Sequence, residues 1–271
     1  MNKIKELALK YIVPGEERVC GCGGEHEVCL RCKICRAESA DLIVEKIKDI
    51  ARYIDHTNLK QHSTSDDIRK LCSEAKNYNF KSVCVNPIFV RFCHSLLKKS
   101  RTMVCSVVGF PLGASISEVK GEETQHCNRE GAKEIDMVNN IAAIKEKDIG
   151  TLLNDVGSVA DVCQNKDAIL KVIIETCLLT EDEKIIACLA AKKAGALFVK
   201  TSTGFSTGGA TVDDIMLMRR VVGPKLGVKA SGGVSSAETA MKMLKAGANR
   251  IGTSSGIAIV EGFNSKKLLS S

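Results

Sequence analysis

Short apolar runs alternate with amphipathic segments along the chain from about residue 50 onward. Eight runs rich in β-branched and other apolar residues recur, at 52–55, 82–86, 103–110, 134–140, 170–176, 196–202, 227–233 and 250–256. The segments between them place apolar residues at helical spacing, as in 66–72 and 235–246. The pattern therefore predicts eight strand–helix units in strict alternation.

The expected helices carry residues that commonly mark helix ends. Ser65, Ser117, Thr180 and Ser235 are candidate N-caps. Glycines followed by alanine, at 131–132, 195–196 and 247–248, fit a residue that ends a helix just before the next strand. Both signals support the alternation of helices and strands.

The expected strands are short and continuously apolar, which indicates a parallel sheet buried on both faces. Eight such units over about 220 residues are typical of a (β/α)8 barrel, the TIM barrel. The alternative, a doubly wound open sheet, usually carries a G-x-G-x-x-G loop after its first strand. Here Asp-His-Thr-Asn follows residue 54. We therefore expect a barrel over residues 46–271, preceded by a helical, cysteine-rich extension over residues 1–45.

Charge and composition narrow the class of ligand. The formal net charge is +7, and residues 1–50 carry nine basic and nine acidic residues, so the whole excess lies in 51–271, where it is spread out. This favours an anionic small molecule over nucleic acid, and the absence of Trp argues against stacking on bases. No apolar run reaches the roughly 20 residues of a membrane span, and no secretory signal is present. We therefore expect a cytoplasmic protein with no membrane partner.

In barrels of this kind the active site lies at the carboxyl ends of the strands. Lys200 ends the sixth apolar run and Lys229 lies in the seventh. A second cation close by disfavours protonation of the first, so one amine is expected to be neutral and able to form a Schiff base with a carbonyl. Strands of the same parity feed the same interior layer, so Asp136 on the fourth strand is expected to approach Lys200 and to move protons.

Loops of glycine and serine follow the last two strands. The stretches "SGG" (231–233) and "GTSSG" (252–256) offer backbone N–H groups and hydroxyls at the usual phosphate position of these barrels. Structural alternatives stay open, since a lysine at a strand end commonly pairs only with a carboxylate, and Asp136 can be such a partner. Cys84 and His56 are interpreted as structural residues, and Asp55 as a residue behind the site.

These segments closely resemble the deoxyribose-phosphate aldolases, a family of class I, Schiff-base-forming aldolases. They occur in the family's order and cover roughly residues 46–262, and the pair "FVKTSTGF" and "VKASGG" is highly specific. The matching segments are "YIDHTNLK" (53–60), "SVCVNP" (82–87), "VVGFPLG" (107–113), "EIDMVNN" (134–140), "LKVIIETCLLT" (170–180), "FVKTSTGFSTGGAT" (198–211), "GVKASGG" (227–233) and "RIGTSSG" (250–256).

The resemblance implies that Lys200 is the Schiff-base lysine, that Lys229 disfavours its protonation, and that Asp136 transfers protons. It implies reversible cleavage of 2-deoxy-D-ribose 5-phosphate to D-glyceraldehyde 3-phosphate and acetaldehyde, without a metal or organic cofactor. Asp55 and Thr57 would face the substrate or support Lys229. Some relatives place a tyrosine near the site from the C-terminus, and this tail, "EGFNSKKLLSS", has none. The phosphate pocket would be lined by Thr203, Gly204, Gly232, Gly233, Ser254 and Ser255.

Residues 1–45 are an addition to the compact members of that family. The stretch "MNKIKELALKYIVPGEE" predicts a short amphipathic helix that docks on its own domain or, less commonly, on a partner. A similar peptide occurs in some enzymes of bacterial microcompartments. Five of the 13 cysteines follow within 16 residues and suit a structural zinc or iron–sulfur site, although a thiol-rich linker is the alternative. These candidate ligands are Cys20, Cys22, Cys29, Cys32 and Cys35.

Three classes of function are therefore open. The leading hypothesis is the Schiff-base aldolase. The second is another phosphosugar lyase or isomerase on a phosphate-binding barrel, and the third is a non-catalytic scaffold protein that acts through the cysteine-rich extension. A homodimer and a docking partner for the extension are compatible with the sequence but not specified by it.

Overall fold

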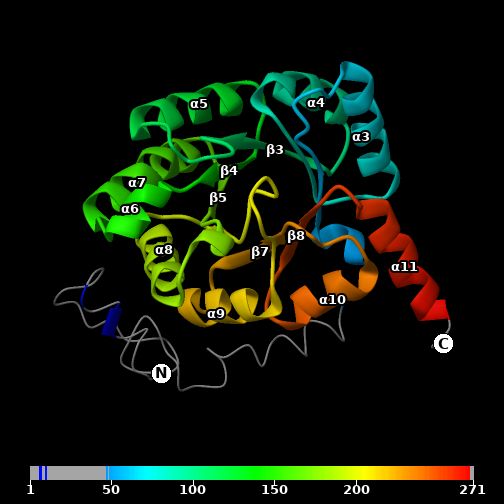
Figure 1. The fold of residues 1–271 in the computed structure, drawn as a ribbon. Coiled ribbons are helices and arrows are strands. Elements are labelled where there is room, and N and C mark those ends of the chain that lie inside the picture. The colour runs from blue at the N-terminus through cyan, green and yellow to red at the C-terminus, as the bar shows by residue number, and fades with distance from the viewer. Residues whose placement is uncertain (1–5, 8–9, 11–46, 48, 269–271) are drawn as a thin grey trace.

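The computed structural model describes residues 6–7, 10, 47 and 49–268. Eight parallel strands pair in sequence order, and β8 pairs with β1, so the sheet closes into a barrel (Figure 1). This confirms the predicted TIM barrel. The strands are β1 Ile54–Asn58, β2 Ser82–Val85, β3 Met103–Val108, β4 Glu134–Val138, β5 Ile169–Ile173, β6 Phe198–Lys200, β7 Gly227–Ser231 and β8 Arg250–Thr253.

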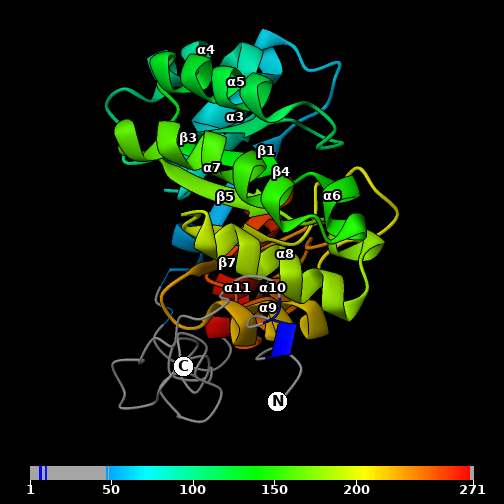
Figure 2. The same cartoon turned by 90° about the vertical axis from the view of Figure 1, so that its left-hand side faces the viewer.

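Helices form a ring around the barrel. Figure 2 shows this ring from the side, where α5 and α7 pack against each other. None of the helices in the described ranges is long and apolar enough to cross a bilayer. The helices are α3 Ser65–Asn77, α4 Val90–Leu97, α5 Ser117–Arg129, α6 Ile141–Glu146, α7 Ile149–Asn165, α8 Glu181–Lys193, α9 Val212–Val222, α10 Ala237–Lys245 and α11 Gly256–Leu268. Short 3-10 turns are η2 Ile50–Tyr53, η3 Pro87–Phe89 and η4 Thr176–Leu178.

Three of the four predicted N-caps are wrong by one residue. Thr64, not Ser65, caps α3, because its hydroxyl and the Asp67 carboxylate each accept a backbone N–H of the other residue. Ser236, not Ser235, caps α10 by accepting the N–H of Thr239 at 3.1 Å. At α5 the Ser117 position is the first helical residue, and the preceding residue makes no side-chain cap.

Other predicted boundaries agree better with the structure. Thr180 caps α8 as expected. Gly131, Gly195 and Gly247 adopt φ values of 109°, 94° and 114°, in the left-handed region that favours glycine, immediately before the next strand. The first expected strand begins later than predicted, at Ile54, because the residues before it form the turn η2.

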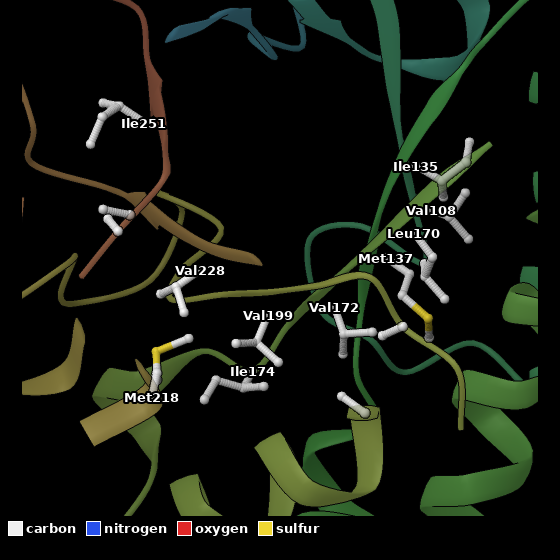
Figure 3. Close-up of a cluster of buried hydrophobic side chains, with 14 of the residues drawn as sticks. Val108, Ile135, Met137, Leu170, Val172, Ile174, Val199, Met218, Val228 and Ile251 are labelled. Atoms are coloured by element: carbon white, nitrogen blue, oxygen red, sulfur yellow. The ribbon is translucent and has the colours of Figure 1, made fainter. Parts of the chain in front are cut away.

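The outward-facing strand side chains form a large part of the hydrophobic core. Val172, Val199 and Val228 are completely buried and belong to the cluster in Figure 3. Full burial of a side chain of this size contributes roughly 1.5–3 kcal/mol. The neighbour of each valine in the chain is a lysine, and the alternation of side chains along a strand turns that lysine into the barrel. The same strands thus supply an apolar outer wall and a charged interior.

The N-terminal extension lies almost wholly outside the described residues. Within it, Glu6 and Leu7 are helical, and Leu7 is half-buried against the main hydrophobic core. The five candidate metal-ligating cysteines, residues 20 to 35, and the division at residue 45 fall on residues that the structure does not describe. The metal site and the domain boundary therefore stay predictions.

A buried ion pair joins the outer helices to the end of β4. The Lys120 ammonium of α5 donates to the Asp155 carboxylate of α7 at 2.8 Å and to the Val138 carbonyl at 3.0 Å. Both side chains are completely or almost completely buried. The same carboxylate accepts the backbone N–H of Asn140 at 3.0 Å, so the pair fixes the backbone that follows Asp136.

We expect Lys120→Met to lower the free energy of unfolding by about 3–5 kcal/mol, because it leaves the Asp155 charge buried without its partner. Urea unfolding followed by circular dichroism measures the change. Lys242→Met is the matched control, because the ammonium of Lys242 pairs with Glu238 where the two side chains are 61% and 63% exposed, and its loss should cost at most about 1 kcal/mol. Equal losses in the two variants would contradict the prediction.

Candidate active site

The structure brings together the three residues predicted to carry the chemistry. Lys200 of β6 and Lys229 of β7 are register partners on adjacent strands. Both ammonium groups donate to the same carboxylate oxygen, Oδ2 of Asp136 on β4, at 2.8 and 2.7 Å. The expected approach of the fourth strand's carboxylate to the sixth strand's lysine is therefore present.

A third lysine, which sequence reasoning missed, completes the surroundings of Asp136. Lys171 of β5 donates to the other oxygen, Oδ1 of Asp136, at 2.8 Å, and contacts Glu134 Oε2 at 2.6 Å. The Cys105 thiol also donates to Oδ1 of Asp136, at 3.2 Å. Both oxygens of this carboxylate are thus held by charged donors. A signal was present in the sequence, since Lys171 follows the start of an otherwise apolar strand.

A second carboxylate, Asp55 of β1, lies behind the lysines. It pairs with Lys229 at 2.5 Å and accepts hydrogen bonds from Arg250 at 2.6 Å and from the Ser82 hydroxyl at 2.7 Å. Arg250, which opens β8, also contacts Glu134 at 2.9 Å. These contacts join the acidic and basic side chains into one interior network. Asp55 contacts Lys229 and is not among the residues that line the pocket, so its support of Lys229 is the expectation that these contacts favour.

Opposite charges set the ionisation of this network. Burial raises the pKa of Asp136, but Lys171, Lys200 and Lys229 outweigh it and hold that pKa well below its ordinary value. Burial also raises the pKa of Asp55, yet the nearby Arg250 and Lys229 bring it below the usual range. Both carboxylates are therefore ionised at neutral pH.

The same balance keeps Lys229 and Lys171 charged. Burial lowers the pKa of Lys229, but the carboxylates of Asp136 and Asp55 raise it above the ordinary lysine value. Burial lowers the pKa of Lys171 as well, but Asp136, Cys105, Glu134 and Asp55 together outweigh it and raise that pKa well above the ordinary value. Lys229 is thus a fixed cation beside the amine of Lys200.

A pocket of about 650 Å³ opens at the carboxyl ends of the strands. Of the charged network, Lys200 alone lines it, with a residue exposure of 3%, whereas Lys229 and Asp136 are completely buried beneath. The pocket wall also includes every other predicted substrate and phosphate residue except Asp55, namely Thr57, Thr203, Gly204, Gly232, Gly233, Ser254 and Ser255.

Glycine loops present backbone donors to this pocket. Gly204, Gly232 and Gly233 adopt φ values of 85°, 84° and 76°, which favour glycine. Within residues 49–268, the N–H groups of these glycines and of Ser254 make no hydrogen bond to protein. The helix α11 begins at Gly256, so its N-terminus follows the same loop. Unpaired N–H groups at a helix start are suited to an anion.

The two residues interpreted as structural, His56 and Cys84, are both buried. His56 pairs through Nε2 with Glu74 at 2.8 Å, and burial lowers the pKa of its ring. Cys84 is completely buried in a small apolar cluster with Leu59 and Val107. The side chain of His56 nevertheless forms part of the pocket wall.

One group in the described part of the chain has a spacing suited to a metal ion. The ligand atoms of Cys84, Cys105 and Asp136 lie within 4.8 Å of one another. Both carboxylate oxygens are already engaged by ammonium groups, and three lysines surround Asp136. This positive environment disfavours a cation, so the group offers no support for a metal centre.

Aldolases are among the known proteins similar to this chain. Residues 50–262 match the family model described as DeoC/LacD family aldolase. The chain is 57% identical over 217 residues to the deoxyribose-phosphate aldolase of Thermococcus kodakarensis, covering 79% of this chain and 97% of that one. It is 57% identical over 215 residues to deoxyribose-phosphate aldolase 1 of Bacillus licheniformis, covering 79% and 96%.

Solved structures agree with this assignment. A putative deoxyribose-phosphate aldolase from Coccidioides immitis superposes with a TM-score of 0.77 at 37% identity, covering 84% of this chain and 97% of that one. The deoxyribose phosphate aldolase of Aeropyrum pernix, described as a unique tetramer, superposes with a TM-score of 0.75 at 29% identity, covering 98% of both chains. The chain therefore belongs to the DeoC/LacD family of aldolases.

Proposed function

We propose that this chain is a deoxyribose-phosphate aldolase, which reversibly cleaves 2-deoxy-D-ribose 5-phosphate to D-glyceraldehyde 3-phosphate and acetaldehyde. The position of Lys200 carries the proposal. Its amine is the one group of the charged network that lines the pocket, beside the buried cation Lys229 and 2.8 Å from Asp136. A lysine placed in this way can attack an aldehyde carbon.

Attack on an aldehyde requires the uncharged amine of Lys200, and the charges of the interior accommodate that form. Three carboxylates, those of Asp55, Glu134 and Asp136, face four basic side chains, those of Lys171, Lys200, Lys229 and Arg250. When Lys200 gives up its proton, three cations balance three anions, and no buried charge is in excess. The proton can leave through the pocket, because Lys200 borders it.

The reaction then follows from the position of Lys200 between the pocket and Asp136. The amine condenses with the open-chain aldehyde at C1 and releases water, and the protonated imine withdraws electrons as the C2–C3 bond breaks. The proton of the C3 hydroxyl passes to Asp136, or to a water that Asp136 holds, as glyceraldehyde 3-phosphate leaves. The remaining enamine is protonated, and water hydrolyses the imine to acetaldehyde and free Lys200.

The glycine and serine loops are proposed to hold the phosphate. The N–H groups of Gly204, Gly232, Gly233 and Ser254 have no protein acceptor in the described ranges, and the start of α11 adds its dipole. Binding energy from the phosphate, remote from the reacting carbons, orients C2 and C3 beside Lys200. No metal or organic cofactor takes part in the proposed steps.

We also propose the domain division, a role for the N-terminal extension and self-association. Residues 46–271 form the aldolase domain, and residues 1–45 add a segment for docking or structural metal binding. Self-association is proposed from the tetramer described for the relative of Aeropyrum pernix. A different phosphosugar lyase or isomerase and a non-catalytic scaffold gain no support from the relatives, and neither does a microcompartment location.

Lys200→Leu should abolish retro-aldol cleavage and leave the fold intact. The substitution removes the nucleophilic amine, and the leucine side chain fills the space of the aliphatic part of the lysine. Incubation with acetaldehyde and sodium borohydride, followed by peptide mass spectrometry, should place a reduced ethyl group on Lys200 of the wild-type chain alone. Turnover that survives in Lys200→Leu, or an adduct on another lysine, would exclude Lys200 as the nucleophile.

Lys229→Met should lower kcat at pH 7 by at least about 100-fold, because removing the neighbouring cation lets Lys200 keep its proton. The deficit should shrink as the pH is raised, since alkaline conditions remove that proton. A pH–rate profile of both proteins tests the point. A deficit of equal size at every pH would contradict this role of Lys229.

Gly252→Ala should lower kcat/KM by about 100-fold, because a Cβ at this β8 position collides with the Ser231 hydroxyl and with Cε of Lys229. Displaced in this way, Lys229 loses its place against Asp136. Gly157→Ala is the matched control, since an added Cβ there meets no atom within 4 Å. Full activity in a folded Gly252→Ala protein would show that the position of Lys229 is not critical.

A further inference from the structure

The loop after β6 forms one wall of the pocket without regular secondary structure. Its residues 201–211 include Thr203, Gly204 and Phe205, all of which line the pocket. The ends of the loop are held by backbone contacts, from the N–H of Thr176 to the Thr201 carbonyl at 2.9 Å and from the N–H of Ala210 to the Gly232 carbonyl at 3.0 Å. The residues that follow the start of the loop have an anchor of their own.

That anchor is a buried carboxylate on the neighbouring strand end. Glu175, which follows β5, is 3% exposed. It accepts the backbone N–H of Thr203 at 3.2 Å and the Thr203 hydroxyl at 2.5 Å. That hydroxyl accepts in turn the N–H of Phe205 at 3.0 Å. The carboxylate therefore fixes three successive residues of the pocket wall, with Gly204 between the two that bond.

Glu175 combines an uncommon backbone conformation with a buried carboxylate that has no cation partner. Its φ of 54° lies in the left-handed region, which is uncommon for residues other than glycine. No lysine or arginine in residues 49–268 forms an ion pair with it, so its charge is compensated only by hydrogen-bond donors. A buried carboxylate without a cation costs free energy. Its place is therefore better explained by what it holds than by its own contribution to stability.

The contacts of Glu175 also change the expected role of Thr203. Both hydrogen-bond donors of Thr203, its N–H and its hydroxyl, are directed to Glu175. Neither is available to a phosphate. The backbone N–H of Gly204, which has no acceptor within the described chain, is the donor that this wall offers to an anion.

We propose that Glu175 is the positioning residue for the phosphate-binding wall and thereby determines the preference for a phosphorylated substrate. This inference rests on the proposed function. Glu175 does not touch the substrate and acts through Thr203, which presents the N–H of Gly204 to the phosphate. The Lys200 amine is held by Asp136 and by the strand register, and the backbone bond from Ile174 N–H to the Lys200 carbonyl does not use the Glu175 carboxylate, so Glu175→Gln leaves these contacts in place.

Glu175→Gln tests the proposal, because it keeps the shape of the side chain and removes its charge. We expect KM for 2-deoxyribose 5-phosphate to rise about tenfold with kcat within about twofold of wild type. The value of kcat/KM for unphosphorylated 2-deoxyribose should stay within about twofold, so the preference for phosphate falls about tenfold. Equal losses with both substrates, or no loss with either, would overturn the proposal.

Glu183→Gln is the matched control. Glu183 is also a buried carboxylate on the segment after β5, but it accepts the N–H of Thr180 at 2.7 Å and contacts Lys145 at 2.8 Å. It has no contact with the loop 201–211 among these bonds. We expect the ratio of the two kcat/KM values to be unchanged in this variant. A matching fall in that ratio would show a general effect of losing a buried charge and would overturn the proposal.

Amide hydrogen exchange gives a readout that does not depend on catalysis. In Glu175→Gln the peptide covering 201–208 should exchange about tenfold faster than in the wild-type chain, and in Glu183→Gln it should not. Unchanged exchange in Glu175→Gln would overturn the positioning role. Absence of retro-aldol turnover in the wild-type chain would instead refute the proposed function, while the exchange result would still decide whether Glu175 fixes the loop.

Discussion

The carboxylate of Asp136 is the contact on which the barrel interior depends. Three ammonium groups, from Lys171, Lys200 and Lys229, reach its two oxygens from neighbouring strands at 2.7–2.8 Å. Any one of those lysines would be costly to bury alone, and none could approach the others without an anion between them. The shared carboxylate therefore fixes both the location of the amine that faces the pocket and the cation beside it.

The barrel architecture offsets the free-energy cost of burying these charges. Alternating side chains place valines such as Val199 and Val228 outside, where they pack under the helices, and send the adjacent lysines inward. The apolar outer wall supplies hydrophobic stabilisation that a charged interior cannot. A parallel register brings Lys200 directly opposite Lys229, so the proximity of two cations is a property of the backbone and not of flexible side chains.

Much of the fold and part of the site could be predicted from the sequence, for physical reasons. Buried parallel strands have continuously apolar sequences, so the eight strand–helix units could be predicted from the pattern. Lys200 and Lys229 could be identified as candidates because each places a charge at the end of such a run or within it. Lys171 was missed because its partners Asp136 and Glu134 lie on another strand and only the fold brings them together. Arg250 was missed because it opens β8, away from the end where function is expected. Glu175 gave no signal as an anchor, because its partner Thr203 is distant in sequence and only tertiary packing brings the two together.

The pocket has a rigid floor and a wall built from loops, and the two are joined by few side chains. The charged floor, centred on Asp136, is shared by several strands, so its members depend on one another for their charge partners. The wall formed by residues such as Thr57 and Phe205 carries no such obligation. Evolution or protein engineering can therefore exchange wall residues to admit new aldehydes, one position at a time, while the chemistry of bond cleavage is inherited intact.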